Sequence, residues 1–206
     1  MSTKSIRPNG RAKLIEAAIN MIRERGYSAS SLDDLCAWAG VSKGAFYYHF
    51  ASKDALATAA LEQWSKTTGA IFASADYLKQ ADPLDRLIGY VQFRKEILAG
   101  QAAQFSCLAG TLVQEVHLSH PIIRSAACES IFDHLAFVET MIAGAKLRHA
   151  PDAAWHPATL SRHIHAVLQG AFILAKAKQD LAPAHQSLDH LLNYLNLIFG
   201  RPATLA

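Results

Sequence analysis

Residues 31–50 have the sequence SLDDLCAWAGVSKGAFYYHF, and this stretch decides the fold of the first part of the chain. Apolar residues at helical spacing predict a helix over 32–39. Gly40 then permits a reversal of the chain, and Ser42 is placed to cap a second helix over 43–50. Two helices joined by such a turn, the second only about two turns long, are typical of a helix-turn-helix. The stretch therefore predicts a DNA-binding unit.

The second helix of this pair carries two groups of side chains. Phe46 and Phe50 are four positions apart on one helix face and are expected in the core. Tyr47, Tyr48 and His49 cannot all share that face, so at least two of them are expected in solvent. Tyrosine and histidine donate hydrogen bonds to phosphate oxygens, so the solvent side suits a DNA backbone.

Residues at the two ends of this helix add contacts of other kinds. Lys43 is long enough to reach a base edge or a phosphate, and Ala45 offers a methyl group to thymine. Gly44 and Ala45 leave the backbone flat, and Lys53 lies just beyond the helix. We expect this short helix to enter the major groove end-on.

Further helices are predicted on both sides of the second helix. One over 11–25 is capped by Asn9 and ended by Gly26, because apolar residues recur at helical spacing: Ile15, Ala18, Ile19 and Ile22. In the helix over 32–39, Leu35 and either Trp38 or Ala39 face inward. Ser52 caps a long helix over 53–75. Three short helices therefore lead into a connector helix.

The rest of the chain also has helical periodicity, and no stretch alternates as a strand does. We expect helices over 84–99, 106–116, from Pro121 to Gly144, 159–178 and 185–199, and one substantial loop over 148–157. The chain is predicted to be all-α.

Composition and charge exclude several classes. With 206 residues, 51% apolar residues and 3 cysteines, the chain is not disordered, collagen-like or stapled by disulfides. It lacks a signal peptide and an apolar run of about 20 residues, so we expect a cytoplasmic protein with no membrane partner. Residues 1–56 hold eight Lys/Arg and five Asp/Glu, whereas residues 57–206 hold twelve of each. The whole net charge of +3 therefore lies on the predicted DNA-binding part.

The segment from Arg11 to Leu56, with Gly26-Tyr27, the run Ala39-Gly-Val-Ser-Lys-Gly-Ala-Phe-Tyr-Tyr-His-Phe50 and Ser52-Lys53, resembles the DNA-binding domain of TetR-family transcriptional regulators. The resemblance covers about a quarter of the chain. It implies DNA contacts at Ser31, Lys43, Gly44, Ala45, Tyr47, Tyr48, His49 and Lys53. Two positions depart from the pattern: Cys36 replaces a small alanine, and Asp33 stands where some relatives place a basic or hydroxyl contact. Lys4, Arg7 and Arg11 form a basic tail that either reaches the minor groove or is merely solvated.

The resemblance also implies an architecture. An N-terminal three-helix helix-turn-helix domain over 1–56 is joined by a connector helix to a larger helical domain over 57–206, which binds an effector and dimerises. A dimer is needed because two recognition helices must meet successive major grooves roughly 34–36 Å apart. The last two helices have wide apolar faces, so we assign the interface to these residues, although each alone could be core: Leu160, Ile164, Val167, Leu168, Ala171, Leu188, Leu191, Leu192, Leu195 and Ile198.

The middle helices are expected to enclose an effector pocket. Its candidate lining residues are aromatic, and each could equally be plain core: Trp64, Tyr90, Phe93, Phe105, Phe132 and Phe137. The chemistry of the effector cannot be deduced from such residues.

Cys107 is a candidate sensor of electrophiles or oxidants. Its segment, Phe105-Ser-Cys-Leu-Ala-Gly110 with Glu115 further on, resembles that of a TetR subset that includes the repressor controlling N-ethylmaleimide reductase. Lys176 matches a lysine near the cysteine in such proteins. A thiol in the first turn of a helix should have a lowered pKa, whereas the alternative is a structural thiol.

Together these features predict a homodimeric transcriptional regulator, a repressor that a small molecule or cysteine modification releases from operator DNA. The alternative is a ligand-independent DNA-binding dimer that acts through a protein partner. We expect no cofactor and no metal, because His117 with His120 and His163 with His165 lack further ligands at suitable spacing. The sequence carries no motif of an enzyme.

Overall fold

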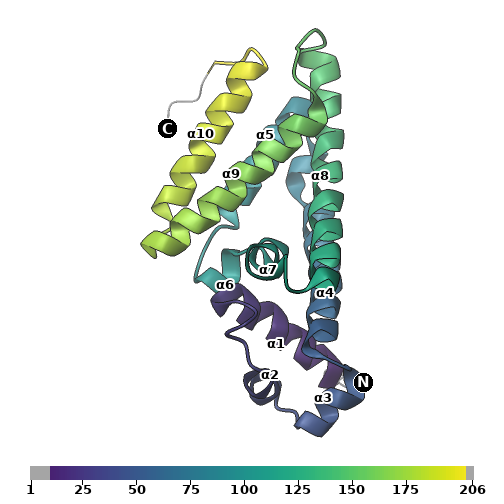
Figure 1. Cartoon of the computed structure of the whole chain (residues 1–206). Coiled ribbons are helices and arrows are strands. Elements are labelled where there is room, and N and C mark those ends of the chain that lie inside the picture. Colours follow the sequence, from purple (N-terminus) through teal and green to yellow (C-terminus); the bar gives the residue numbers. More distant parts are fainter. Residues whose placement is uncertain (1–9, 203–206) are drawn as a thin grey trace, which may run out of the picture. The chain divides into compact units, whose positions relative to one another are not determined.

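A computed structural model describes residues 10–202, apart from the side chains of residues 102 and 103 (Figure 1). The described chain is helical and contains no strand. It divides into two compact units: unit 1 holds residues 10–67 and 106–130, and unit 2 holds residues 68–105 and 131–202. The predicted all-α fold class is confirmed. Residues 57–67 and 106–130 pack with the N-terminal helices, so the compact units do not divide at residue 56. The predicted boundary there concerns function and stays a prediction.

Unit 1 contains the predicted motif and the helices that pack with it. They are α1 (Gly10–Arg25), α2 (Leu32–Ala39), α3 (Lys43–His49), the first part of α4 (Lys53–Ser74), α7 (Leu108–Val116) and the start of α8 (Pro121–His149). Gly26 ends α1 with φ +94° and Gly40 ends α2 with φ +63°, conformations that favour glycine. The helices predicted over 11–25, 32–39, 43–50 and 53–75 are thus confirmed to within one residue at each end.

Unit 2 contains the end of α4, the 3₁₀ helix η1 (Asp76–Lys79), α5 (Pro83–Glu96), α6 (Ala102–Phe105), the rest of α8, α9 (Pro157–Lys178) and α10 (Ala182–Ile198). Helices α9 and α10 pack against one another, and α10 also packs on α5. The core contains buried aliphatic side chains from α5, α8, α9 and α10, including Leu87, Ile142, Leu168 and Leu188.

Several predicted helix ends were wrong: the helix predicted over 84–99 ends at Glu96, and those predicted from residues 159 and 185 begin at Pro157 and Ala182. The helix from Pro121 does not end before Gly144 but runs to His149, and a Cβ on Gly144 would lie 3.5 Å from Pro83 Cβ. That distance is an ordinary van der Waals contact, so the packing here does not require glycine, and the helix continues because one glycine in a helix interior costs only about 1 kcal/mol. The helix predicted from residue 106 begins at Leu108, because Cys107 has extended backbone and acts as its N-cap.

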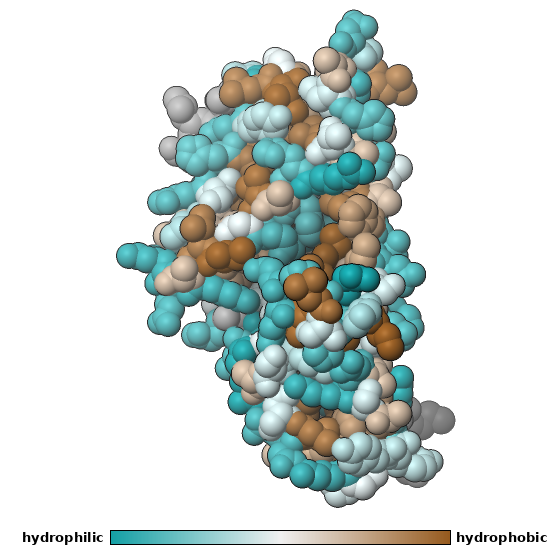
Figure 2. Space-filling view, viewed as in Figure 1, coloured by the Kyte–Doolittle hydropathy of each residue, from teal (hydrophilic) through white to brown (hydrophobic). Residues whose placement is uncertain are grey.

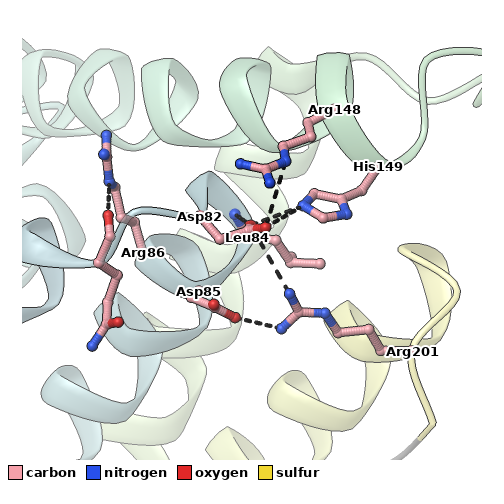
Figure 3. A network of polar contacts seen from close by, with 8 residues as sticks. Asp82, Leu84, Asp85, Arg86, Arg148, His149 and Arg201 are labelled. Carbon is pink, nitrogen blue, oxygen red and sulfur yellow. Dashed lines mark hydrogen bonds and ion pairs between the residues drawn. The ribbon is translucent and has the colours of Figure 1, made fainter.

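In unit 2, a polar network centred on Asp82 joins the start of α5, the end of α8 and Arg201, which follows α10 (Figure 3). The Asp82 carboxylate accepts from the Leu84 backbone N–H at 2.7 Å and so caps α5. It also lies 2.8 Å from His149 Nε2 at the end of α8 and 3.9 Å from the Arg201 guanidinium, which pairs with Asp85 at 2.6 Å. Burial alone would raise the pKa of Asp82, but the Leu84 amide, His149 and Arg148 outweigh it and lower that pKa.

Candidate nucleic-acid interface

The start of each helix in the predicted motif is fixed by a serine. Ser31 Oγ accepts from the Asp34 backbone N–H at 3.1 Å and caps α2. Ser42 Oγ accepts from the Ala45 backbone N–H, also at 3.1 Å, and caps α3. Between them the Val41 N–H donates to the Cys36 carbonyl at 3.0 Å, which closes the turn. The motif therefore folds as a helix-turn-helix, as predicted.

The inward face of α3 is apolar. Phe46 is fully buried, Phe50 nearly so, and their ring centroids are 6.0 Å apart. On α2, Leu35 and Ala39 are buried while Trp38 is exposed, which settles the alternative between Trp38 and Ala39. The two predicted core aromatics are thus confirmed, and they hold α3 in place.

The outward face of α3 is open to solvent. Tyr48 is 85% exposed and Tyr47 is 59% exposed, and Lys43 and Gly44 are exposed as well. Ala45 and His49 are half-buried. Two bare tyrosine hydroxyls and an ammonium on a helix of seven residues form a surface that phosphate oxygens and base edges can approach. The structure thus places six of the eight predicted DNA-binding residues on one short helix, whereas Ser31 and Lys53 lie elsewhere.

Lys43 forms an ion pair with Asp33 that was not predicted from the sequence. Its Nζ lies 2.6 Å from Asp33 Oδ1, and the hydrogen bond to Asp33 raises the pKa of Lys43. Both side chains are exposed, so the pair stabilises the fold little and can open when a phosphate approaches. Asp33 therefore holds the cation at the start of α3 in the free protein. Arg11 lies with its Cζ 5.3 Å from the Phe50 ring centre, whereas Lys4 and Arg7 are outside the described residues.

Lys53 is engaged inside unit 1. Its ammonium donates to the Tyr27 carbonyl at 2.6 Å and lies 4.0 Å from the centre of the Tyr27 ring. Burial lowers the pKa of Lys53, and Glu115 and Asp54 oppose that shift. In the free protein Lys53 ties the end of α1 to the start of α4, and its DNA contact stays a prediction.

Tyr27 and Glu115 form a polar junction that sequence reasoning missed. The Glu115 carboxylate of α7 accepts from the backbone N–H groups of Tyr27 at 2.5 Å and Ser28 at 2.7 Å. The Tyr27 hydroxyl donates to Asp54, and its ring packs edge-on to His120. Gly26-Tyr27 stood in the TetR-like pattern, but only the fold shows that residue 115 meets it. The junction fixes the helix-turn-helix on its supporting helices.

Arg23 makes a second junction between α1 and the start of α7. Its Nε donates to the Ser106 carbonyl at 2.6 Å, and its Cζ lies 4.3 Å from the centre of the Trp64 ring. Burial lowers the pKa of Arg23 to about 10, and the neighbouring Cys107 opposes this shift. The group stays charged at neutral pH, and Trp64 is its packing partner within unit 1.

Cys107 caps α7 through sulfur. Its Sγ accepts from the Gly110 backbone N–H at 3.4 Å, and the side chain is partly exposed. Cys36 is buried and Cys128 is exposed. Lys176 lies on α9 in unit 2, so its association with Cys107 stays a prediction.

The predicted effector residues do not all gather. Tyr90, Phe93 and Phe137 pack in unit 2 with Phe72, Tyr77 and His134. Phe105 contacts Phe172 of α9, with ring centroids 6.2 Å apart. Phe132, by contrast, is exposed, and Trp64 serves unit 1. The same cluster is bordered by His165 and Arg94, which were not among the residues predicted from the sequence.

Most of the residues predicted for the dimer interface face the core of unit 2. Their burial shows that they form the core of unit 2: Leu160, Ile164, Leu168, Ala171, Leu188, Leu191 and Leu195 are buried, and Val167, Leu192 and Ile198 pack against them. The seven buried side chains have little surface left for a second copy, whereas Val167, Leu192 and Ile198 are half-buried, so the dimer interface stays a prediction. The apolar side chains that α9 and α10 expose are Ile173, Leu174, Tyr194 and Leu197.

Comparison with known proteins agrees with this geometry. Residues 14–60 match the family model described as bacterial regulatory proteins, tetR family. The chain is 23% identical over 185 residues to the HTH-type transcriptional repressor NemR of Escherichia coli strain K12, covering 90% of this chain and 93% of NemR. The solved structure of E. coli NemR in its reduced form superposes with a TM-score of 0.78 over 95% of this chain and all of that one. A TetR regulator from Chloroflexus aurantiacus, 21% identical, gives 0.79 over 96% of this chain and 97% of its own.

Another relative has higher sequence identity over most of both chains. The HTH-type transcriptional repressor DhaR of Mycobacterium sp. strain GP1 is 30% identical over 181 residues, which span 86% of this chain and 88% of DhaR. This similarity extends far beyond the helix-turn-helix and into the helices of unit 2. The chain therefore belongs to the TetR family of helix-turn-helix DNA-binding transcriptional regulators.

Proposed function

We propose that the protein is a cytoplasmic, homodimeric repressor that binds operator DNA through α3 and leaves it when unit 2 binds an effector. The observation that carries the DNA-binding part is the bare outer face of α3, where Tyr47 and Tyr48 are exposed beside Lys43. Large aromatic side chains left in solvent on a capped two-turn helix have no role in the core, but they suit contact with a phosphate backbone. The relatives named as repressors support the direction of control.

Selection of bound fragments from genomic DNA, followed by footprinting, tests this proposal. We expect an inverted repeat whose half-sites lie roughly 34–36 Å apart. Tyr48→Ala should weaken binding at least tenfold. Leu118→Ala, which truncates an equally exposed side chain between α7 and α8, should leave it unchanged. Equal affinity of the two variants would refute docking through α3.

The exposed apolar residues of α9 and α10 support a dimer interface there. Ile173, Leu174, Tyr194 and Leu197 remain in solvent although their helices bury their other faces. Figure 2 shows hydrophobic side chains reaching the surface where Figure 1 draws α9. Such a surface is stabilised when a second copy covers it.

Sedimentation of two aspartate variants tests the interface. Leu197→Asp removes a side chain that is 63% exposed on α10, and Leu147→Asp removes one that is 80% exposed on α8. We expect the first substitution to produce monomers and the second to leave the dimer intact. Dimers of both variants would place the interface elsewhere.

We also propose that Cys107, assisted by Lys176, is a second input through thiol modification. Its partly exposed sulfur at the cap of α7 and the nearby Arg23 cation support this role. Mass spectrometry after mild maleimide treatment should label Cys107 faster than Cys128, although Cys128 is the more exposed thiol. Equal or slower labelling would leave Cys107 a structural thiol. If neither effectors nor thiol reagents release DNA, the ligand-independent alternative is favoured.

A further inference from the structure

A cation without a counter-charge among the described residues lies beside the aromatic core of unit 2. Arg94 of α5 is half-buried, with its Cζ 5.2 Å from the Phe72 ring centre and 5.8 Å from the Phe172 ring centre. Within residues 10–202, no hydrogen bond or ion pair joins this guanidinium to another group. Its neighbours on α5 do have partners: Lys95 pairs with Asp189 at 2.5 Å, and Arg86 donates to the Gln80 carbonyl at 2.6 Å. The half-buried Arg94 guanidinium therefore keeps its hydrogen-bond donors for an anion.

Two imidazoles border the guanidinium but cannot neutralise it. The rings of His134 and His165 lie 6.3 Å apart, and His134 Nε2 is hydrogen-bonded to the Tyr90 hydroxyl at 2.8 Å. Burial, and then the charge of Arg94, lowers the pKa of His134 to about 3 and that of His165 to about 4. Both rings are therefore neutral at physiological pH, so the cluster keeps one positive charge and no negative one.

His165 also offers a donor that nothing accepts. Its Nε2 lies 3.2 Å from the Gln169 side-chain nitrogen, which can only donate. A neutral imidazole that accepts at Nε2 carries its proton on Nδ1. His165 Nδ1 is buried and finds no partner among the described residues. The cluster thus combines an unpaired cation, an unpaired N–H donor and aromatic walls.

We propose that this cluster binds the carboxylate of a small organic acid with an apolar body. The Arg94 guanidinium pairs with the carboxylate oxygens, and His165 Nδ1–H donates to one of them. The rings of Phe72, Phe93 and Phe137 pack against the apolar body. This assignment rests on the proposed function, since it names the chemical class of the effector that unit 2 would bind. The aromatic lining favours an organic acid over an inorganic anion, which needs no apolar contacts.

Thermal unfolding and titration calorimetry of the full chain test the proposal. The probes are benzoate, phenylacetate, 4-phenylbutyrate and hexanoate as sodium salts, each beside its neutral amide, with sodium chloride and phosphate at equal ionic strength. We expect at least one carboxylate to raise the Tm and its amide to have no effect. The Arg94→Gln variant should bind that carboxylate at least tenfold more weakly, whereas Arg86→Gln, the same change at a guanidinium bonded to Gln80, should bind it as the wild type does.

Several outcomes would overturn the assignment. They are no shift with any carboxylate, an equal shift with the amide, an equal shift with chloride or phosphate, or unaltered binding by Arg94→Gln. If Arg94→Gln does not fold, ¹⁵N NMR of the wild type decides, because carboxylate binding should move the His165 Nδ1 resonance more than the amide does. Operator binding by the wild type is measured separately: its absence would refute the proposed function but leave a measured carboxylate site intact.

Discussion

Arg23 in unit 1 and Arg94 in unit 2 both lie against aromatic rings, but their surroundings differ. Arg23 donates to the Ser106 carbonyl and covers Trp64, and the neighbouring Glu115 carboxylate accepts two backbone N–H groups. Arg94 lies over the rings of Phe72 and Phe172 and has no hydrogen bond or ion pair among the described residues, and His165 Nδ1 of the same cluster has no partner there either. Buried polar groups that are hydrogen-bonded to one another fix a structure. The bonds of Arg23 and Glu115 hold the helices of unit 1 together, whereas the unpaired groups of unit 2 are those to which we assign a ligand in the proposal above.

The largest expected effect is a loss of stability in acid, caused by the two buried imidazoles of unit 2. His134 and His165 have a pKa of about 3 and about 4 when folded, against 6.5 for a free imidazole. As the pH falls below 6.5, the unfolded chain takes up protons that the folded chain does not. The free energy of unfolding should then fall by up to about 1.4 kcal/mol per pH unit for each imidazole, as urea titrations between about pH 7.5 and pH 5 can measure.

Histidine variants provide the control for this pH dependence. The double variant His134→Phe with His165→Phe should flatten it, whereas His190→Phe, at an exposed histidine, should not. An unchanged slope in the double variant would show that other groups cause the acid sensitivity.

The junction of unit 1 should respond most to a methyl group at Gly26. A Cβ there would lie 2.8 Å from Glu115 Oε2 on a backbone with φ +94°, whereas a Cβ on Gly40, at φ +63°, meets nothing within 4 Å. We expect Gly26→Ala to cost about 3 kcal/mol of unfolding free energy and Gly40→Ala about 1 kcal/mol. Denaturant titration measures both. Equal losses would mean that Glu115 moves aside freely.

Removal of each arginine compares the two units directly. Arg23→Met leaves the buried Ser106 carbonyl without its donor and should cost roughly 2–3 kcal/mol. Arg94→Met removes a cation with no polar partner in the described chain and should cost under about 1 kcal/mol. Thermal unfolding of both variants without added ligand compares the two losses of stability. A larger loss for Arg94→Met than for Arg23→Met would contradict the absence of a polar partner for Arg94.

The smallest expected effect lies on the outer surface of unit 1. Tyr47→Phe removes one exposed hydroxyl and should weaken operator binding by about 1 kcal/mol on every sequence, with an unchanged Tm. Lys43→Ala should cost a similar amount, reduce the salt slope by about 1 and relax base preference. Fluorescence anisotropy over a salt series separates the two. Unaltered affinity in both would remove the outer face of α3 from the interface.

Local sequence signals were sufficient wherever the relevant contacts lie within a few residues. The serine caps at Ser31 and Ser42, the glycine ends at Gly26 and Gly40, and the division of Phe46 from Tyr48 all follow from short-range rules. The same rules failed at Gly144, because a single glycine inside a helix costs only about 1 kcal/mol, which the packing of the rest of α8 outweighs. They did not decide the role of the leucines of α9 and α10, because periodicity identifies an apolar face but not what covers it.

The amino-acid sequence alone determined an all-α fold with a helix-turn-helix whose second helix was predicted over 43–50 and is observed at Lys43–His49, since capping and helical period are encoded locally. Only the tertiary structure decided that Glu115 meets Tyr27, that Lys53 lies under that ring, and that Arg94, His134 and His165 come together. These residues are separated by 26 to 88 positions along the chain or lie on different helices. Contacts of that kind depend on how helices pack, which no short-range pattern specifies.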